Sequence, residues 1–174
     1  LFKISNFKNS AFIDMELGYE SGVYNDENVS FALFSIYDDY SPIDIKELKE
    51  QMPNNIIIGL FHGSIVGGVL PNGYATESGI DKNVFSDCDL TLAGHIHKYQ
   101  EIKIQDSKFI YVGSFVQKDF GETISQHGYL EVNINEDKTY DYLFHELKNE
   151  YGFFNIEIGK KEDIDNDKEI LINF

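Results

Sequence analysis

Two short runs of the sequence, residues 55–61 and 89–93, are predominantly apolar, and they constrain the fold more than any other feature. A strand that faces solvent on one side alternates apolar and polar residues, whereas a short continuous apolar run is typical of a strand covered on both faces. A glycine-rich stretch and a short helical segment at residues 81–85 separate the two runs. We therefore predict two buried strands in a sheet that has protein packed against both of its faces.

Other segments complete a pattern of the α+β class. Residues 29–37 are β-branched and aromatic, as expected for a buried strand. Ser41 and Pro42 are suited to the N-cap and first helical position, and Asp44 adds an acidic group to the first turn, so a helix is predicted over residues 42–52. Beyond the second apolar run, turns connect short strands into predicted hairpins, with strands at residues 100–104, 108–112, 129–134 and 139–144.

The two ends of the chain differ from its centre. Residues 1–13 have a helix-like apolar spacing with no capping residue ahead of it, which suggests an entry in the middle of a fold. The composition changes near residue 150, and strands are predicted at residues 153–158 and 169–174. We therefore predict one domain over residues 1–150 and the start of another over residues 151–174.

Histidines follow both apolar runs. His62 follows the first run, and His95 and His97 follow the second. Open α/β sheets bind ligands at the carboxyl ends of their strands, and imidazole is the commonest metal ligand among side chains. Gly63 and Gly94 allow the backbone to turn sharply beside an ion or a phosphate. The pattern predicts that the three imidazoles converge on a metal site, although a lone histidine at a strand end is more often a polar structural residue.

Two metal-dependent hydrolase patterns are disfavoured. A zinc hydrolase of the β-lactamase type has the pattern His-x-His-x-Asp-His, but Lys98, Tyr99 and Gln100 follow His97 here. A histidine-triad hydrolase needs a third alternate histidine, at the place that Tyr99 occupies.

The order and content of several segments resemble the calcineurin-like metallophosphoesterases. Within that superfamily, the chain is similar to the SbcD and meiotic-recombination nucleases, and especially to their relatives in tailed phages. The segments that carry the resemblance are Leu-Phe-His-Gly at 60–63, Gly-His-Ile-His-Lys-Tyr-Gln at 94–100, Tyr-Val-Gly-Ser-Phe-Val-Gln at 111–117, Phe-Gly-Glu at 120–122 and His-Gly-Tyr-Leu at 127–130. Gly-His-x-His is typical of the whole superfamily, and the two segments between 111 and 122 point to the nuclease branch.

The resemblance implies a two-metal DNA exonuclease or endonuclease subunit that acts in recombination and repair. His62 and His95 would bind one divalent ion and His97 the other, usually manganese. Gly63, Gly94, Ser114 and Glu122 would orient ligands or line a phosphate loop. The implied fold is the C-terminal part of a metallophosphoesterase β-sandwich, in which a strand-helix-strand unit precedes β-hairpins, and residues 151–174 would begin a capping, DNA-binding domain.

The remaining family motifs are absent from this sequence. They are Asp-x-His, Gly-Asp-x-x-Asp and Asn-His, and the last supplies the general acid histidine of the family. We therefore expect the chain by itself to bind metal weakly and to be inactive. The expected partners of the full-length protein are DNA, an SbcC-like ATPase subunit and a second copy of the chain. A phosphomonoesterase or cyclic phosphodiesterase on the same scaffold, and a non-catalytic interaction domain, stay open as alternatives.

Composition bounds these hypotheses. The formal net charge of −16 argues against a surface that grips nucleic acid by neutralising phosphates alone. Cys88 is the only cysteine, which excludes an internal disulfide and a cysteine-rich zinc site. No stretch has the length and apolarity of a membrane span, and no signal-peptide pattern opens the chain. We expect a cytoplasmic protein of a bacterium or a phage-infected cell, without a membrane partner.

Overall fold

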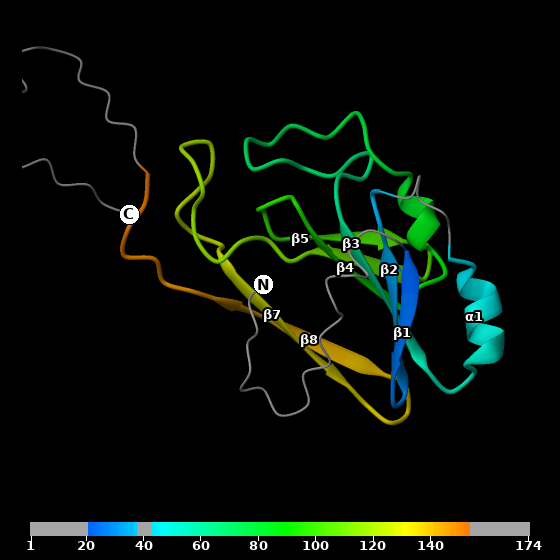
Figure 1. The fold of residues 1–174 in the computed structure, drawn as a ribbon. Coiled ribbons are helices and arrows are strands. Elements are labelled where there is room, and N and C mark those ends of the chain that lie inside the picture. The colour runs from blue at the N-terminus through cyan, green and yellow to red at the C-terminus, as the bar shows by residue number, and fades with distance from the viewer. Residues whose placement is uncertain (1–20, 38–42, 154–174) are drawn as a thin grey trace, which may run out of the picture.

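The computed structural model describes residues 21–37 and 43–153 of the chain. Strands dominate the mixed α and β structure of these residues (Figure 1). In chain order the elements are β1 Gly22–Asp26, β2 Val29–Phe34, α1 Ile45–Gln51, β3 Ile56–His62, the 3-10 helix η2 Lys82–Phe85, β4 Leu90–Gly94, β5 Gln100–Ile104, β6 Ser107–Tyr111, β7 Gly128–Ile134 and β8 Tyr140–Glu146. No helix among the described residues is long and apolar enough to span a membrane.

A six-stranded sheet with the order β1-β2-β3-β4-β6-β5 forms the centre of the molecule. The strands β2, β3, β4 and β6 run parallel to one another, and β1 and β5 pair antiparallel at the two edges. The four parallel strands therefore end at one edge of the sheet, where open α/β sheets bind ligands.

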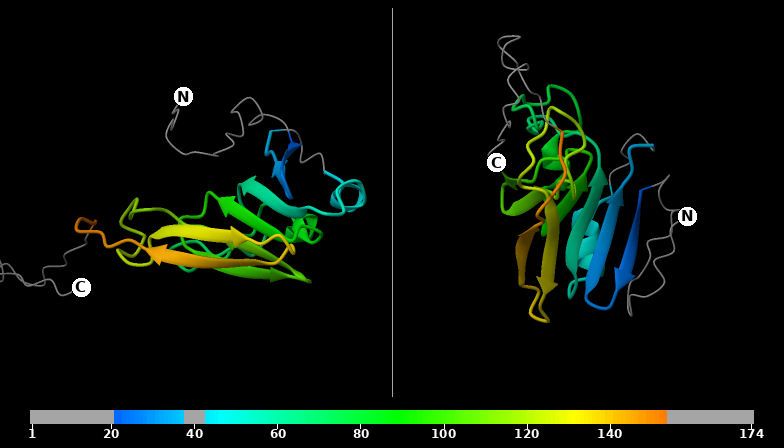
Figure 2. Two further views of the ribbon diagram at one scale, coloured as in Figure 1. Left: turned by 90° about the horizontal axis from the view of Figure 1, so that it is seen from below. Right: turned by 90° about the vertical axis from the view of Figure 1, so that its left-hand side faces the viewer.

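Protein covers both faces of this sheet, as the two apolar runs predicted. On one face, α1 and η2 pack through Ile45, Leu48 and Phe85. On the other face lies the separate two-stranded sheet β7-β8 (Figure 2). The strand β3 faces both layers, because its side chains alternate: Ile57 belongs to the core on the helical face, and Ile58 to the core beneath the hairpin.

The helix α1 begins later than predicted. Residues 42–52 were expected to be helical with Ser41 as the N-cap, but the helix begins at Ile45. Asp44 is the N-cap: its backbone is extended, with φ −71° and ψ 93°, and its carboxylate accepts a hydrogen bond from the Glu47 amide at 2.9 Å. A carboxylate at this position satisfies an otherwise unpaired amide and interacts favourably with the helix dipole, which explains the later start. Ser41 and Pro42 lie outside the described residues.

The predicted helical segment at residues 81–85 is a four-residue 3-10 helix, η2, which Asp81 caps. The strand β1 was not predicted, because its short sequence contains one apolar aliphatic residue, Val23, and ends in polar residues. Pairing with β2 through a tight turn at Glu27, where φ is +49°, makes it a strand.

Both predicted hairpins are present, but they occupy different places. The hairpin β5-β6 extends the main sheet, because β6 pairs parallel with β4. The hairpin β7-β8 forms the second sheet of the sandwich. The expected helical spacing at residues 1–13 and the expected strand at 169–174 lie outside the described residues, as does all but the first residue of the strand expected at 153–158.

Candidate metal centre

The first two candidate ligands lie at the ends of neighbouring parallel strands. His62 is the last residue of β3 and pairs with Gly94, the last residue of β4, and His95 follows directly. The two imidazole rings lie with their centroids 5.7 Å apart and their planes at 67°. Both histidines are exposed to solvent, so a ligand can reach them.

The backbone at this edge is shaped around the His62 ring. A Cβ atom on Gly94 would lie 2.8 Å from Nδ1 of His62, closer than real side chains approach one another. The next residue, His95, has a φ of +89°, a left-handed conformation that costs a non-glycine residue about 1–2 kcal/mol. Strained backbone that the surrounding packing maintains is characteristic of functional sites. Ile96, which is 1% exposed, anchors the chain immediately after this strained residue.

The third candidate ligand, His97, is held by a buried carboxylate. Its Nδ1 lies 2.7 Å from Oε1 of Glu122, whose side chain is 4% exposed. The second carboxylate oxygen, Oε2, accepts a hydrogen bond from the Lys118 amide at 2.7 Å. In this contact the carboxylate oxygen can accept a hydrogen bond that Nδ1 of His97 donates. The Nε2 atom has no hydrogen-bond partner among the described residues, which is the arrangement that carboxylates impose on metal-binding histidines.

A buried glutamine fixes the loop that carries Glu122. The side-chain nitrogen of Gln117 donates hydrogen bonds to the backbone carbonyl oxygens of Glu122 at 2.9 Å and Phe153 at 3.1 Å. Its side-chain oxygen accepts a hydrogen bond from the backbone amide of Phe153 at 2.7 Å. Gln117 is 6% exposed. Gln117 therefore ties together the loop, the buried carboxylate and the chain at Phe153. Sequence reasoning gave Gln117 no individual role, although it ends one of the segments that carry the family resemblance.

The hydrogen bonds of two other predicted site residues do not involve His62, His95 or His97. The carbonyl oxygen of Gly63 accepts a hydrogen bond from the Tyr111 hydroxyl at 2.8 Å. Burial raises the pKa of that hydroxyl. Ser114 contacts Nδ1 of His127 at 3.0 Å and donates to the Val116 carbonyl at 2.9 Å. His127 is itself buried, so these contacts stabilise the loop.

The donor set fits part of a metal site. Two neighbouring imidazoles and a third that a carboxylate supports are suitable ligands for divalent transition metals. Within residues 21–37 and 43–153, however, no group of three or more His, Cys, Asp or Glu side chains is placed to hold an ion. Asp89 is committed elsewhere, because its carboxylate contacts the Lys49 ammonium at 2.8 Å and the Ile57 amide at 2.7 Å. The binding of metal by His62, His95 and His97 stays a prediction.

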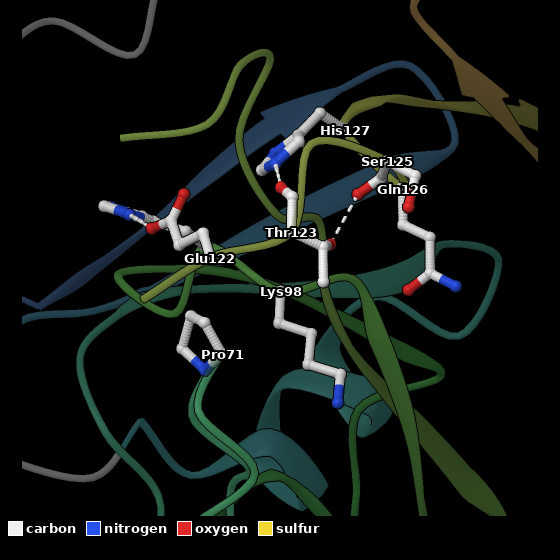
Figure 3. A pocket seen from close by; sticks show the side chains of 8 residues that line it. Pro71, Lys98, Glu122, Thr123, Ser125, Gln126 and His127 are labelled. Atoms are coloured by element: carbon white, nitrogen blue, oxygen red, sulfur yellow. Dashed lines mark hydrogen bonds and ion pairs between the residues drawn. The ribbon is translucent and has the colours of Figure 1, made fainter. Parts of the chain in front are cut away.

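A pocket of about 90 Å³ lies beside His97 (Figure 3). Its lining residues come from three parts of the chain: Pro71, His97, Lys98, Glu122, Thr123, Ser125, Gln126 and His127. Lys98, Thr123, Ser125 and Gln126 had not been predicted from the sequence to belong to the site. Lys98 follows the Gly-His-x-His segment directly, which is the one local signal that pointed towards it.

Comparison with known proteins gives partial relationships. No family model matches the chain. The chain is 27% identical over 153 residues to uncharacterized protein R555 of Acanthamoeba polyphaga mimivirus, an alignment that covers 84% of this chain and 11% of that protein. It is 33% identical over 101 residues to the SbcD component of the SbcCD nuclease of Staphylococcus saprophyticus, an alignment that covers 55% of this chain and 26% of that component.

The chain is thus similar to a nuclease subunit along slightly more than half of its length. The chain spans 11% and 26% of the lengths of these two relatives.

Proposed function

We propose that this chain is part of a metal-dependent nuclease subunit of the SbcD type, which hydrolyses phosphodiester bonds in DNA during recombination and repair. The observation that carries the proposal is the pair of accessible imidazoles, 5.7 Å apart, at the ends of adjacent parallel strands. The similarity to the SbcD component of the SbcCD nuclease supports the same function. An SbcC-like ATPase and a second copy of the chain are the proposed protein partners.

In this proposal, His62 and His95 would hold one divalent ion and His97 a second, both of them manganese. Such an ion pair would supply a hydroxide nucleophile at neutral pH and would offset charge on the phosphate. The protein contributes a fixed geometry: Gly94 leaves room for the His62 ring, and Glu122 keeps the hydrogen of His97 on Nδ1, so that Nε2 is available as a ligand.

Further ligands must come from outside the described residues. Three neutral imidazoles do not offset the charge of two divalent ions, and such sites use carboxylates for this purpose. No carboxylate lies beside the His62 and His95 pair in a group able to hold an ion, within the part of the chain that the structure describes. We therefore expect the 174-residue chain alone to bind Mn²⁺ weakly and to hydrolyse no phosphodiester.

The proposal is tested with the full-length protein that contains this chain. Cleavage of linear duplex DNA and of a chromogenic phosphomonoester is measured side by side while Mn²⁺ is titrated. We expect Mn²⁺-dependent cleavage of DNA that His62→Ala removes, with the fold checked by circular dichroism. Efficient hydrolysis of the monoester without DNA cleavage would instead identify a phosphatase on the same scaffold, and hydrolysis by the 174-residue chain alone would show that the histidines do not need additional ligands.

A further inference from the structure

The pocket beside His97 has a cationic side that the proposed metal centre does not use. Lys98 and Gln126 extend along it opposite Pro71, and Glu122 lies to one side (Figure 3). The pocket has a volume of about 90 Å³, and seven of its eight lining residues are polar or charged. The pocket therefore suits a small polar group.

Lys98 differs from the other half-buried lysines of the described chain. Three lysines there are half-buried, Lys49, Lys98 and Lys108. Lys49 contacts Asp89 at 2.8 Å, and Lys108 contacts Glu101 at 3.1 Å. The ammonium group of Lys98 makes no ion pair or hydrogen bond within residues 21–37 and 43–153.

This lack of a partner is informative in a strongly acidic protein. The chain carries 30 acidic side chains against 14 basic ones, and all of the basic ones are lysines. A partly desolvated ammonium is destabilised when no anion or hydrogen-bond acceptor accompanies it. A carboxylate partner for Lys98 would thus be easy to supply, and the lack of one among residues 21–37 and 43–153 leaves the cation available to an external anion.

Two further donors line the same pocket. The Ser125 hydroxyl and the Gln126 side-chain amide form no hydrogen bond with the rest of the described chain. The backbone of these two residues is held in place. The backbone amide of Gln126 donates a hydrogen bond to Oε1 of Glu146 at 2.8 Å, and the Thr123 hydroxyl donates one to the Ser125 carbonyl at 2.9 Å.

The one carboxylate that lines the pocket, that of Glu122, already has partners within the protein. Glu122 is 4% exposed at its side chain, and its two oxygens are committed to the His97 ring and to the Lys118 amide. Hydrogen bonds from both partners offset its negative charge, and a divalent ion on His97 would offset it further.

We propose that this pocket binds a phosphate group of the nucleic-acid strand, next to the phosphodiester that the histidines hold. Lys98 supplies the positive charge, and Ser125 and Gln126 supply neutral hydrogen bonds to the phosphate oxygens. The assignment to a DNA strand rests on the proposed function, whereas the binding of phosphate rests on the pocket alone. This site also explains how so acidic a chain can orient a nucleic acid: through one placed cation and not through a basic surface.

The test uses the ¹⁵N-labelled 174-residue chain without metal. Inorganic phosphate is titrated, and the amide signals of Lys98, Ser125 and Gln126 are followed by NMR. We expect saturable shifts confined to the pocket. Lys98→Gln should weaken phosphate binding about tenfold, the magnitude of one charge-assisted hydrogen bond. Lys103→Gln is the matched control, because Lys103 is exposed on β5 and has no ion pair among the described residues.

A second titration distinguishes binding of a phosphate within a DNA strand from binding of free inorganic phosphate. The oligonucleotide (dT)₄ should bind more tightly than inorganic phosphate, and Lys98→Gln should weaken it by a similar factor. Unsaturable shifts, or equal binding by the Lys98→Gln and Lys103→Gln variants, would overturn the site. Binding of inorganic phosphate with none of (dT)₄ would overturn the assignment to a strand.

The outcome is distinguishable from that of the proposed function. The phosphate titration is carried out without metal, so it does not depend on the proposed metal centre. Phosphate binding that depends on Lys98 upholds the pocket even where the full-length protein cleaves no DNA. Conversely, DNA cleavage by a protein whose pocket binds no phosphate upholds the nuclease and overturns the pocket.

Discussion

Two histidine–glutamate pairs in this protein have nearly the same length and different surroundings. His97 lies 2.7 Å from Glu122, and His145 on β8 lies 2.6 Å from Glu131 on β7. The Glu122 side chain is 4% exposed, whereas that of Glu131 is 50% exposed. In addition, the His145 ring stacks on Tyr129 at 4.7 Å, so it acts as a cross-strand packing residue of the hairpin.

The comparison teaches that the distance between a histidine and a carboxylate does not identify a functional site. A solvated pair on a hairpin contributes little to stability, since water screens its charges and both side chains lose entropy. A buried carboxylate that other hydrogen bonds hold in place can instead orient a ring that lines a pocket. The two pairs are therefore matched controls for each other.

The largest difference is expected in activity. If the full-length protein is the proposed nuclease, His97→Ala should lower its DNA cleavage at least about 100-fold, because loss of a proposed metal ligand costs more than loss of that ligand's hydrogen-bond partner. His145→Ala should leave the rate within a factor of about two, since the contacts of its ring with other described residues lie within the hairpin. Initial rates on linear duplex DNA at saturating Mn²⁺ measure both. Equal losses of activity in the two variants would show that the buried pair is no more important for function than the exposed pair.

The second largest difference is expected between the carboxylates of the two pairs, Glu122 and Glu131, in their effect on metal affinity. Glu122→Ala is expected to weaken the proposed metal binding of the same full-length protein about 10- to 100-fold, because His97 loses the partner that orients its ring. Glu131→Ala should not change it. Titration with Co²⁺, followed by its absorption spectrum, measures affinity independently of catalysis. Unchanged affinity in Glu122→Ala would mean that the carboxylate is structural.

Substitutions of two glutamines test how the loop that carries Glu122 is held in place. Gln117→Ala removes three hydrogen bonds of a buried amide, and should lower the free energy of unfolding by about 1–3 kcal/mol. Gln126→Ala removes an exposed side chain without such bonds in the described structure and should change it by less than about 0.5 kcal/mol. Urea unfolding of the 174-residue chain measures both values, provided that the free energy of unfolding falls with urea concentration at the same slope in each variant. A small effect of Gln117→Ala would show that the chain at Phe153 is not anchored through this residue.

The smallest effect concerns an exposed carboxylate on the hairpin side of the sheet. Hydrogen bonds from Tyr142, then from Tyr99, hold the pKa of Glu101 below its usual range. Because the folded pKa is lowered, the stabilisation is complete above the usual carboxyl pKa and is lost as the pH falls through the lowered value. The Glu101 side chain is 39% exposed, so solvent screening limits this contribution to less than about 1 kcal/mol.

Tyr142→Phe removes the largest cause of the lowered pKa. We expect a smaller loss of stability on acidification in this variant, visible as a flatter dependence of the unfolding midpoint on pH in the acidic range. Tyr129→Phe is the control, because its hydroxyl forms no hydrogen bond with the other described residues. A steeper acid dependence in Tyr142→Phe than in the control would contradict this assignment.

Local patterns were sufficient to predict most of the strands and the places of His62 and His95 at the ends of two of them. The apolar runs became β3 and β4, and His62 and His95 lie side by side because parallel neighbours end at the same edge. The boundaries at α1 were less predictable, since Ser41 and Asp44 are both good N-caps and their sequence does not decide between them. The resemblance also singled out Glu122, but its contact with His97 spans 25 positions of the chain.

The sequence by itself determined which segments become buried strands and which side chains stand at their ends, because apolar periodicity and glycine placement act over a few residues. Only the tertiary structure decided that β6 joins β4, that Glu122 is buried against His97, and that Lys98 has no carboxylate partner in the described chain. The physical reason is that such contacts depend on how separate layers pack. Burial and the presence or absence of a partner are therefore properties of the folded molecule and not of any local pattern.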